Sequence, residues 1–318
     1  MPAPHPNLSE AACDADRRPH RYRLFGLAVE SDLPLPELVA DPDEGPADVF
    51  VRLRPIAGYA ETAAGLRIEG EDALLTIPGI GRFLARGGRE MVVEPAAQVS
   101  PRNLRLYLLG SGFGAILHQR GLLPLHANAV VVDGRAIGFM GHPGAGKSTL
   151  AAWFHDRGFE VLADDVCVVT VGADGRPLAH PGIPRLRLWR EALEASGRTP
   201  SSYERSFDDM DKYTVPTDLE RALPAVPLSH LYLLEKAEEA PSVARLEGAA
   251  AVEAMVANTY RGSYVRQMGR TREHLLACAQ LARAVPVFRA RRRWGFDNFD
   301  GEGEALEAHA RELARRDR

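Results

Sequence analysis

The chain contains 318 residues, of which 45% are hydrophobic and 26% are charged, with a formal net charge of −4. This length predicts about two domains, and the charge gives no reason to expect nucleic acid or a membrane surface as the main partner. Cys13, Cys167 and Cys278 are odd in number and widely spaced, so they indicate no disulfide framework and fit a reduced setting. The sequence has no apolar run of about 18 residues and no secretory signal, so we expect a cytoplasmic protein without a transmembrane helix.

The first third of the chain is predicted to be rich in β-strands. We expect residues 1–19 to form a flexible leader. From residue 20 to residue 102, short apolar pieces alternate with Pro, Gly and Asp turn signals, and none has a helical period over the length of a helix. This pattern predicts a small β-rich N-terminal domain that carries no recognisable chemistry of its own.

Residues 103–300 are predicted to form a mixed α/β domain, and residues 301–318 an amphipathic C-terminal helix. Apolar residues at helical intervals predict a helix over 103–121, with Gly121 as its C-cap. Asp133-Gly134 lies between two apolar runs, which is the strongest short hairpin signal. We therefore expect an antiparallel hairpin before the following glycine-rich segment. Residues 159–171 are predicted to be one buried strand, and further strands are expected at 185–189, 229–237 and 285–294.

The segment Gly141-His-Pro-Gly-Ala-Gly-Lys-Ser-Thr149 matches the pattern G-x-x-x-x-G-K-[ST] between a predicted strand and a predicted helix. Its glycines permit positive φ angles, so that successive backbone N–H groups can turn towards phosphate oxygens. The helix that follows directs its positive end to the same place. The pattern predicts that Lys147 contacts the β- and γ-phosphates of ATP and that Ser148 ligates Mg²⁺. The alternative is a strand–helix turn that carries Lys-Ser by chance. The predicted nucleotide-binding residues are Gly141, His142, Pro143, Gly144, Ala145, Gly146, Lys147, Ser148 and Thr149.

Asp164 and Asp165 lie on the predicted strand that follows the helix. Neighbouring side chains on a strand face opposite ways, so one carboxylate could address an acceptor hydroxyl and the other metal-bound water. A pair of aspartates that ends a strand is the structural alternative. His126, before the hairpin, could stabilise charge near the γ-phosphate or hold an aspartate in place, although a buried histidine is the plainer interpretation.

The segment from Leu125 to Asp165 resembles the catalytic core of HPr kinase/phosphorylase, a bacterial serine kinase with a histidine before a hairpin, this loop and an Asp-Asp on the next strand. The resemblance implies an α/β fold with a P-loop core of the HPr kinase and phosphoenolpyruvate carboxykinase type, preceded here by the β-rich domain. It implies that Lys147 and Ser148 bind nucleotide phosphate and Mg²⁺ and that Asp164 is the general base. The resemblance also implies that Ser148 and Asp165 bind the metal. Asp165 and His126 are further expected to support the catalytic site.

Two departures from that family bear on the acceptor. Residues 180–189, His-Pro-Gly-Ile-Pro-Arg-Leu-Arg-Leu-Trp, stand where the family has a glycine-rich signature linked to dephosphorylation. The N-terminal part is more similar to HPr-kinase-related proteins of peptide-biosynthesis clusters, some of which resemble kinases of the C-terminal serine of lasso peptide precursors. On that interpretation the β-rich domain helps to recognise a serine-containing peptide or small protein.

Four basic residues are candidates for contacting phosphates or a peptide carboxylate. Solvated surface charges are the alternative for each of them. The four residues are Arg185, Arg187, Lys212 and Arg261. Alternation along a strand places Arg185 and Arg187 on the same face.

The sequence predicts an ATP- and Mg²⁺-dependent serine kinase. Two alternatives remain: a small-molecule kinase with the same loop and aspartates, and a nucleotide-binding regulator without catalysis. HPr kinase/phosphorylase assembles as a hexamer. Because the segments named above differ from that family, the resemblance allows a homo-oligomer for this chain but does not give the number of subunits.

Overall fold

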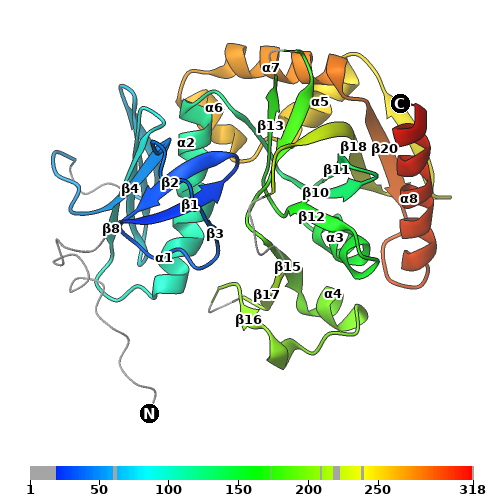
Figure 1. Cartoon of the computed structure of the whole chain (residues 1–318), viewed down its shortest axis with the longest axis horizontal. Helices are drawn as coiled ribbons and strands as arrows, with labels where there is room; N and C mark the ends of the chain where they lie inside the picture. The colour runs from blue at the N-terminus through cyan, green and yellow to red at the C-terminus, as the bar shows by residue number, and fades with distance from the viewer. Residues whose placement is uncertain are drawn as a thin grey trace. The chain divides into compact units, whose positions relative to one another are not determined.

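The structure is a computed structural model that describes residues 19–59, 63–172, 174–207, 210–217, 223–237 and 240–316. It is a mixed α/β protein with three sheets, drawn in Figure 1. The chain forms two compact units: Met1–Gly121 with Ser263–Arg270, and Leu122–Gly262 with Thr271–Arg318. Residues 1–18, which the sequence predicts as part of a flexible leader, lie outside the described residues. No helix among the described residues is long and apolar enough to cross a membrane.

The strands predicted in the first unit form one eight-stranded sheet in the order β3-β1-β2-β4-β8-β7-β6-β5. Most neighbours are antiparallel, but β4 pairs in parallel with both β2 and β8. The strands are β1 (His20–Leu24), β2 (Leu27–Ser31), β3 (Val39–Ala40), β4 (Val49–Leu53), β5 (Gly65–Glu69), β6 (Asp72–Ile77), β7 (Gly81–Arg86) and β8 (Glu90–Pro95).

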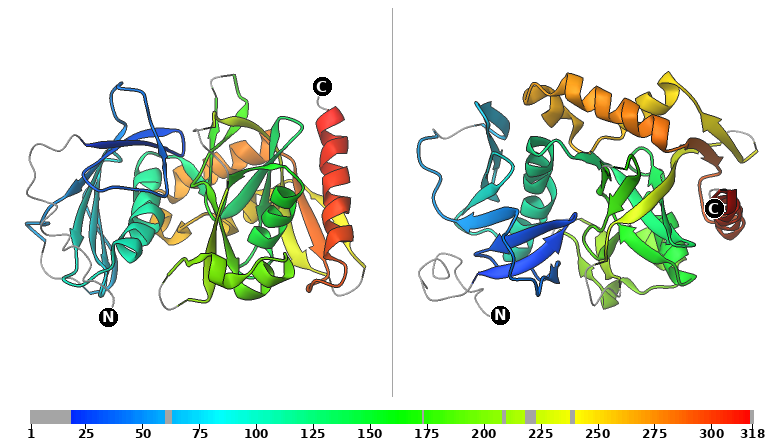
Figure 2. Two further views of the ribbon diagram at one scale, coloured as in Figure 1. Left: turned by 60° about the horizontal axis from the view of Figure 1, so that its bottom comes forward. Right: turned by 45° about the horizontal axis from the view of Figure 1, so that its top comes forward.

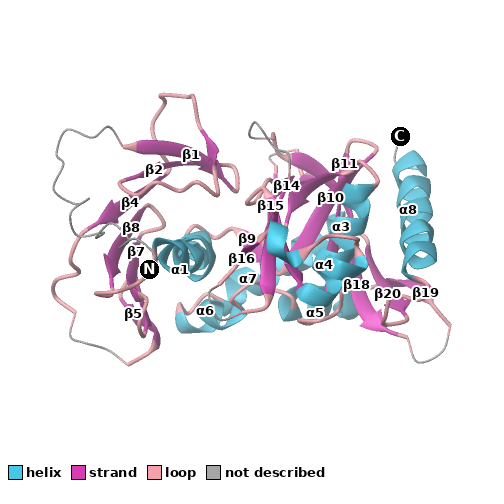
Figure 3. Ribbon diagram, turned by 90° about the horizontal axis from the view of Figure 1, so that it is seen from below, coloured by secondary structure: helices cyan, strands magenta, loops and turns pink. Residues whose placement is uncertain are grey.

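The helix predicted over 103–121 is present as α1 (Pro101–Tyr107), a π-helical turn (Leu108–Gly112) and α2 (Phe113–Gln119). The helix lies against one face of the sheet of the first unit (Figure 3), and its apolar residues are buried there. The chain leaves the helix at Gly121, whose φ of 70° is the left-handed conformation of the predicted cap. This packing is why the first unit ends at Gly121, whereas the sequence places the domain boundary at residue 102.

The main sheet of the second unit has nine strands, with β12-β10-β11-β18-β14-β13-β9 in one row and β20 and β19 beyond β18. β11, β18 and β20 are parallel to one another. The strands are β9 (Leu123–Leu125), β10 (Ala127–Val132), β11 (Arg135–Met140), β12 (Glu160–Ala163), β13 (Cys167–Val171), β14 (Pro177–His180), β18 (Val226–Lys236), β19 (Ser242–Leu246) and β20 (Val287–Arg292).

Helices cover both faces of this sheet (Figures 1 and 2). On one face, Val130 and Val132 of β10 share a core with α3 (Lys147–Asp156) and α8 (Phe299–Arg316). On the other, Ala127 and Ala129 face α5 (Ala249–Ala257) and α7 (Thr271–Ala284). Successive side chains of β10 therefore alternate between two cores, as strand geometry requires.

A smaller sheet, β15 (Arg185–Trp189), β17 (Lys212–Pro216) and β16 (Glu204–Arg205), contributes Leu186 and Leu188 to the core around α3. α4 (Arg190–Ala195) follows β15, and a 3₁₀ turn (Pro200–Ser202) follows α4. Helix α6 (Gly262–Gln267) belongs to the first unit from Ser263 onwards.

The prediction of one strand over 159–171 is wrong. The segment forms β12 and β13, which pair with different neighbours: β12 with β10, and β13 with β9 and β14. Between them Asp165 has a φ of 72°, a left-handed conformation that ends the strand and that Asp tolerates better than most residues. Asp164 and Asp165 therefore lie in a turn at the end of β12, not on opposite faces of one strand.

Candidate functional site

The hairpin before the glycine-rich loop is formed as predicted. Val132 of β10 pairs with Arg135 of β11, and the two residues between them, Asp133 and Gly134, have φ angles of 49° and 77°. Positive φ at both positions matches the right-handed twist of the strands. The hairpin fixes the end of β11 at Met140, from which the loop begins.

The loop 141–146 joins β11 to the N-terminus of α3 and takes the backbone that its glycines permit. Gly141, Gly144 and Gly146 have φ angles of 148°, 86° and 83°. A Cβ at Gly141 would lie 2.9 Å from the carbonyl oxygen of Leu234, so a side chain does not fit between the loop and β18. The first turn of α3 contributes free backbone N–H groups at the same place.

Lys147 lies over this loop. Its ammonium donates to the carbonyl oxygens of Gly141 and His142 at 2.6 and 3.2 Å. Burial lowers the pKa of Lys147, although the charges of Asp165 and Asp164 act in the opposite direction. The ammonium is thus placed within the loop, where an anion would replace carbonyl oxygens as its partner.

Asp164 contacts the first turn of α3. Its Oδ1 accepts a hydrogen bond from the Ser148 hydroxyl at 2.9 Å, and its Oδ2 accepts one from the backbone N–H of Arg187 at 2.8 Å. Burial raises the pKa of this carboxyl above its ordinary value, and the Asp165 charge adds to the rise. The Ser148 hydroxyl is a hard oxygen ligand that suits Mg²⁺, and its hydrogen bond to Asp164 places that carboxylate beside the ion's expected position. The described part of the chain holds no group of three His, Cys, Asp or Glu side chains that could bind a metal, so Mg²⁺ here would depend on phosphate oxygens and water.

Asp165 has different partners from Asp164. The His126 ring nitrogen Nε2 lies 3.3 Å from its Oδ1, and the Arg187 guanidinium pairs with its Oδ2. Burial acts to raise the pKa of Asp165, but Arg187 and His126 outweigh it and hold that pKa well below the ordinary value. Two adjacent carboxyls thus have pKa values displaced in opposite directions, an arrangement typical of acid–base sites.

The four basic candidates are placed differently. Arg187 contacts Asp165, and Lys212, on the neighbouring strand β17, has its pKa lowered by burial and by the charge of Arg187. Arg185 is on the same face of β15 as Arg187, and its charge also acts on Lys212. The Arg261 guanidinium lies 5.5 Å from the centre of the Tyr260 ring, and that ring contacts His126. Arg187 and Lys212 are therefore close to the aspartates, Arg185 acts on Lys212, and Arg261 contacts the Tyr260 ring.

Sequence reasoning missed two asparagines that organise the site. Asn128 is fully buried in β10, and its amide donates to Asp164 Oδ1. Asn258 follows α5; its side-chain oxygen accepts the Gly141 N–H at 2.9 Å, and its backbone oxygen accepts the His126 N–H at 2.6 Å. A polar residue within the apolar run Ala127–Val132 was the available signal for Asn128, while Asn258 carries no local signal.

No family model matches this chain, and no curated protein matches it. Among solved structures, it is similar to the HPr(Ser) kinase/phosphatase from Coxiella burnetii, with 13% sequence identity and a TM-score of 0.33. The similarity covers 61% of this chain and 97% of that chain. It is too low to support an inference about activity.

Proposed function

We propose that the second unit binds ATP with Mg²⁺ at residues 141–149 and transfers the γ-phosphoryl group to a serine hydroxyl of a peptide or small protein. The observation that carries the proposal is the contact between the loop and the aspartate pair. Ser148, in the first turn of the loop helix, is hydrogen-bonded to Asp164 at 2.9 Å, and Asp165 is the next residue. One carboxylate beside a phosphate-binding loop is enough to hold a metal, and a second adjacent one is available to take the proton of an acceptor hydroxyl, which supports transfer over nucleotide binding alone.

The opposite pKa displacements support a division of roles. Asp164, with its raised pKa, takes the proton of the serine hydroxyl as the serine oxygen bonds to the γ-phosphorus and the bond from that phosphorus to the β-phosphate oxygen breaks. Asp165 stays ionised beside His126 and Arg187 and would accept hydrogen bonds from water on a bound Mg²⁺. Bound Mg²⁺ would neutralise phosphate charge, and Lys147 would hold the β- and γ-phosphates.

The acceptor is the finer part of the proposal. Arg187 and Lys212 are charged groups near the aspartates and would orient an anionic acceptor, such as a peptide that ends in a carboxylate. The C-terminal serine of a lasso peptide precursor is one acceptor of this kind, by the resemblance described above. Transfer of labelled phosphate to peptides with a terminal serine, compared with the same peptides amidated at the C-terminus, tests this acceptor class.

Substitution of Asp164 tests the catalytic assignment. We expect Asp164→Asn to lower kcat for phosphoryl transfer about 100-fold or more, because a positioned general base contributes roughly 10²–10⁴ in rate. ATP affinity should change little, whereas Lys147→Ala should lose nucleotide binding as well. The measurements are labelled transfer from ATP and equilibrium binding of ATP in Mg²⁺.

A matched control is Asp174→Asn, in the turn between β13 and β14, where the side chain is exposed. This variant should behave as wild type. Asp165→Asn should raise the Mg²⁺ concentration needed for half-maximal activity. Normal turnover by Asp164→Asn would show that Asp164 is not the general base. Transfer of phosphate to sugars or nucleosides, and never to peptides, would show that the acceptor is a small molecule.

A further inference from the structure

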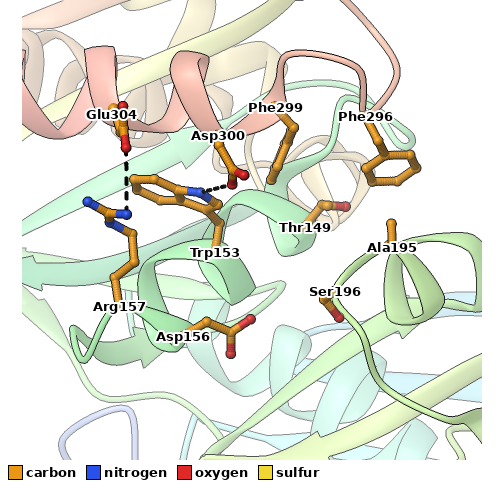
Figure 4. Close-up of a pocket in the computed structure, with 11 residues that line it drawn as sticks. Thr149, Trp153, Asp156, Arg157, Ala195, Ser196, Phe296, Phe299, Asp300 and Glu304 are labelled. Carbon is orange, nitrogen blue, oxygen red and sulfur yellow. Dashed lines mark hydrogen bonds and ion pairs between the residues drawn. The ribbon is translucent and has the colours of Figure 1, made fainter.

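A cavity of about 350 Å³ lies beside the glycine-rich loop, on the outer side of α3. This volume is at the lower end of the range of small-molecule sites, roughly 300–1,000 Å³. Its walls come from α3, from the end of α4 and from the segment that leads into α8, all within the second unit (Figure 4). Apolar and aromatic lining comes from Trp153, Ala195, Phe296 and Phe299.

The cavity adjoins the proposed phosphate site at Thr149. Thr149 lines it and is the residue directly after Ser148. Thr149, Trp153 and Asp156 are spaced at i, i+4 and i+7, so they share one face of α3. At 1.5 Å per residue this face extends about 10 Å from the phosphate end of the helix. A ligand whose phosphates lie on the loop could therefore place its remaining part along this face.

Aromatic side chains form the apolar part of the cavity. Phe296 is 46% exposed, and its ring centre lies 6.0 Å from that of Phe299. Trp153 is fixed in place: its indole N–H donates to Asp300 at 2.8 Å, and the Arg157 guanidinium lies 4.5 Å from its ring centre. An exposed phenylalanine beside a fixed aromatic wall provides a stacking surface for a planar base.

The polar part of the cavity has three carboxylates and one guanidinium, from Asp156, Asp300, Glu304 and Arg157. Each carboxylate has a partner in the structure: Asp156 pairs with Arg198, Asp300 accepts the Trp153 indole N–H, and Glu304 lies 3.8 Å from Arg157. Ionised carboxylates only accept hydrogen bonds, so their remaining lone pairs suit ligand hydroxyl and amino groups. Ribose hydroxyls and the amino group of a base have this chemistry.

We propose that this cavity binds the base and ribose of the nucleoside triphosphate, an inference that rests on the proposed binding of its phosphates at residues 141–149. The base stacks on Phe296, and the sugar lies near Thr149, between the phosphates and the base. Inorganic tripolyphosphate, which lacks base and sugar, uses the loop but not the cavity.

The test compares Mg²⁺-dependent equilibrium binding of ATP and of tripolyphosphate by the full chain. Phe296→Ala removes the stacking surface, and Ala195→Trp fills the cavity from an exposed position on α4. Both should weaken ATP binding about 10- to 100-fold, the loss that follows from removing one base–aromatic stack. Both should leave tripolyphosphate binding unchanged.

Two matched controls lie outside the cavity lining. Trp294→Ala removes an aromatic that is 51% exposed in the same segment as Phe296, and Ala308→Trp adds a large side chain at an exposed position of α8. Neither should change the affinity for either ligand.

The outcomes separate this inference from the proposed function. If Phe296→Ala and Ala195→Trp bind ATP as tightly as the wild type does, the cavity is not the base site, although the phosphates can still bind at residues 141–149. Equal weakening of ATP and tripolyphosphate also overturns it, because the variants then act on the loop. Wild-type protein that binds neither ligand overturns both the cavity assignment and the proposed function.

Discussion

Asn128 connects the interior of the sheet to the candidate catalytic carboxylate. It is buried in β10 among alanine and valine, and its amide donates to Asp164 Oδ1, while its own Oδ1 has no hydrogen-bond partner among the described residues. A buried polar group costs free energy unless it is hydrogen-bonded, so a half-satisfied amide in an apolar strand points to a role at the site. That role is to support the charged form of a carboxylate that burial otherwise disfavours.

Substitution of Asn128 should change the pH dependence of phosphoryl transfer. Loss of an N–H donor raises the pKa of Asp164 further, so in Asn128→Ala the acid limb of the kcat profile moves to higher pH. Asn128→Asp places a second carboxyl against Asp164 and should move the limb further in the same direction. The measurement is kcat between pH 5 and 9, with the unfolding midpoint as a control for folding. Identical acid limbs in wild type and both variants would exclude this role of Asn128.

The elements around the site differ in how far the sequence predicts them. The hairpin, the loop and the start of α3 depend on local signals, Asp133-Gly134 and the glycines of 141–146, and these were confirmed as elements. The division of 159–171 into β12 and β13 depends on which strands lie beside each half, β10 for one and β9 and β14 for the other. Pairing of this kind involves residues far apart in the chain, so periodicity within the segment does not show it.

The contacts of Asp164 and Asp165 also involve residues far apart in the chain, so the sequence predicts them only in part. Arg187 was a candidate because of its alternation with Arg185, but only the fold places its guanidinium on Asp165 and its backbone N–H on Asp164. Asn258 reaches Gly141 from a helix end more than 100 residues later in the chain. The sequence therefore predicted the loop well and the surroundings of the aspartates only in part.

Helix α8 packs directly on the Trp153 ring, and a glycine makes this possible. A Cβ at Gly303 would lie 2.6 Å from the indole, whereas a Cβ at Gly301 would meet only the end of the Asn298 side chain, at 3.0 Å. Gly→Ala in a helix usually stabilises by up to about 1 kcal/mol. We expect this result for Gly301→Ala, but for Gly303→Ala a loss of about 1–3 kcal/mol because of overpacking.

Urea unfolding of the two glycine variants measures this difference in the free energy of unfolding. The pair is matched, since both glycines lie in the first turns of α8 and receive the same methyl group. Equal stability of Gly301→Ala and Gly303→Ala would contradict the close contact between α8 and Trp153.

At the scale of the whole molecule, the chain builds two units that are not two consecutive segments. Residues Ser263–Arg270 belong to the first unit, although in the chain they follow residues 122–262 of the second unit. Arg270 donates to the carbonyl oxygens of His118 and Gln119 at 2.6 and 2.9 Å, at the end of α2. The last carbonyl groups of a helix need such partners, so residues 1–121 alone lack part of their own unit. No local pattern in 263–270 predicts this return.

The two units can be followed separately, because Trp153, Trp189 and Trp294 all lie in the second unit. Tryptophan fluorescence therefore reports the unfolding of the unit that contains the candidate site. Its stability should depend on pH through His230 of β18, which is 1% exposed and packed against Tyr232 and Phe288.

Burial, with a smaller contribution from His309, lowers the pKa of His230 from 6.5 to about 3. Between these values the unfolded chain binds a proton that the folded chain does not, so stability is complete above pH 6.5 and falls as the pH is lowered. At pH 5 the loss is about 2 kcal/mol, from roughly 1.5 pKa units at 1.36 kcal/mol each. His230→Leu should remove this part of the loss. The test is the difference in urea unfolding free energy between pH 7 and pH 5, measured by tryptophan fluorescence. If that difference is the same in His230→Leu and wild type, His230 is not a buried neutral histidine, and the acid sensitivity of the second unit lies elsewhere.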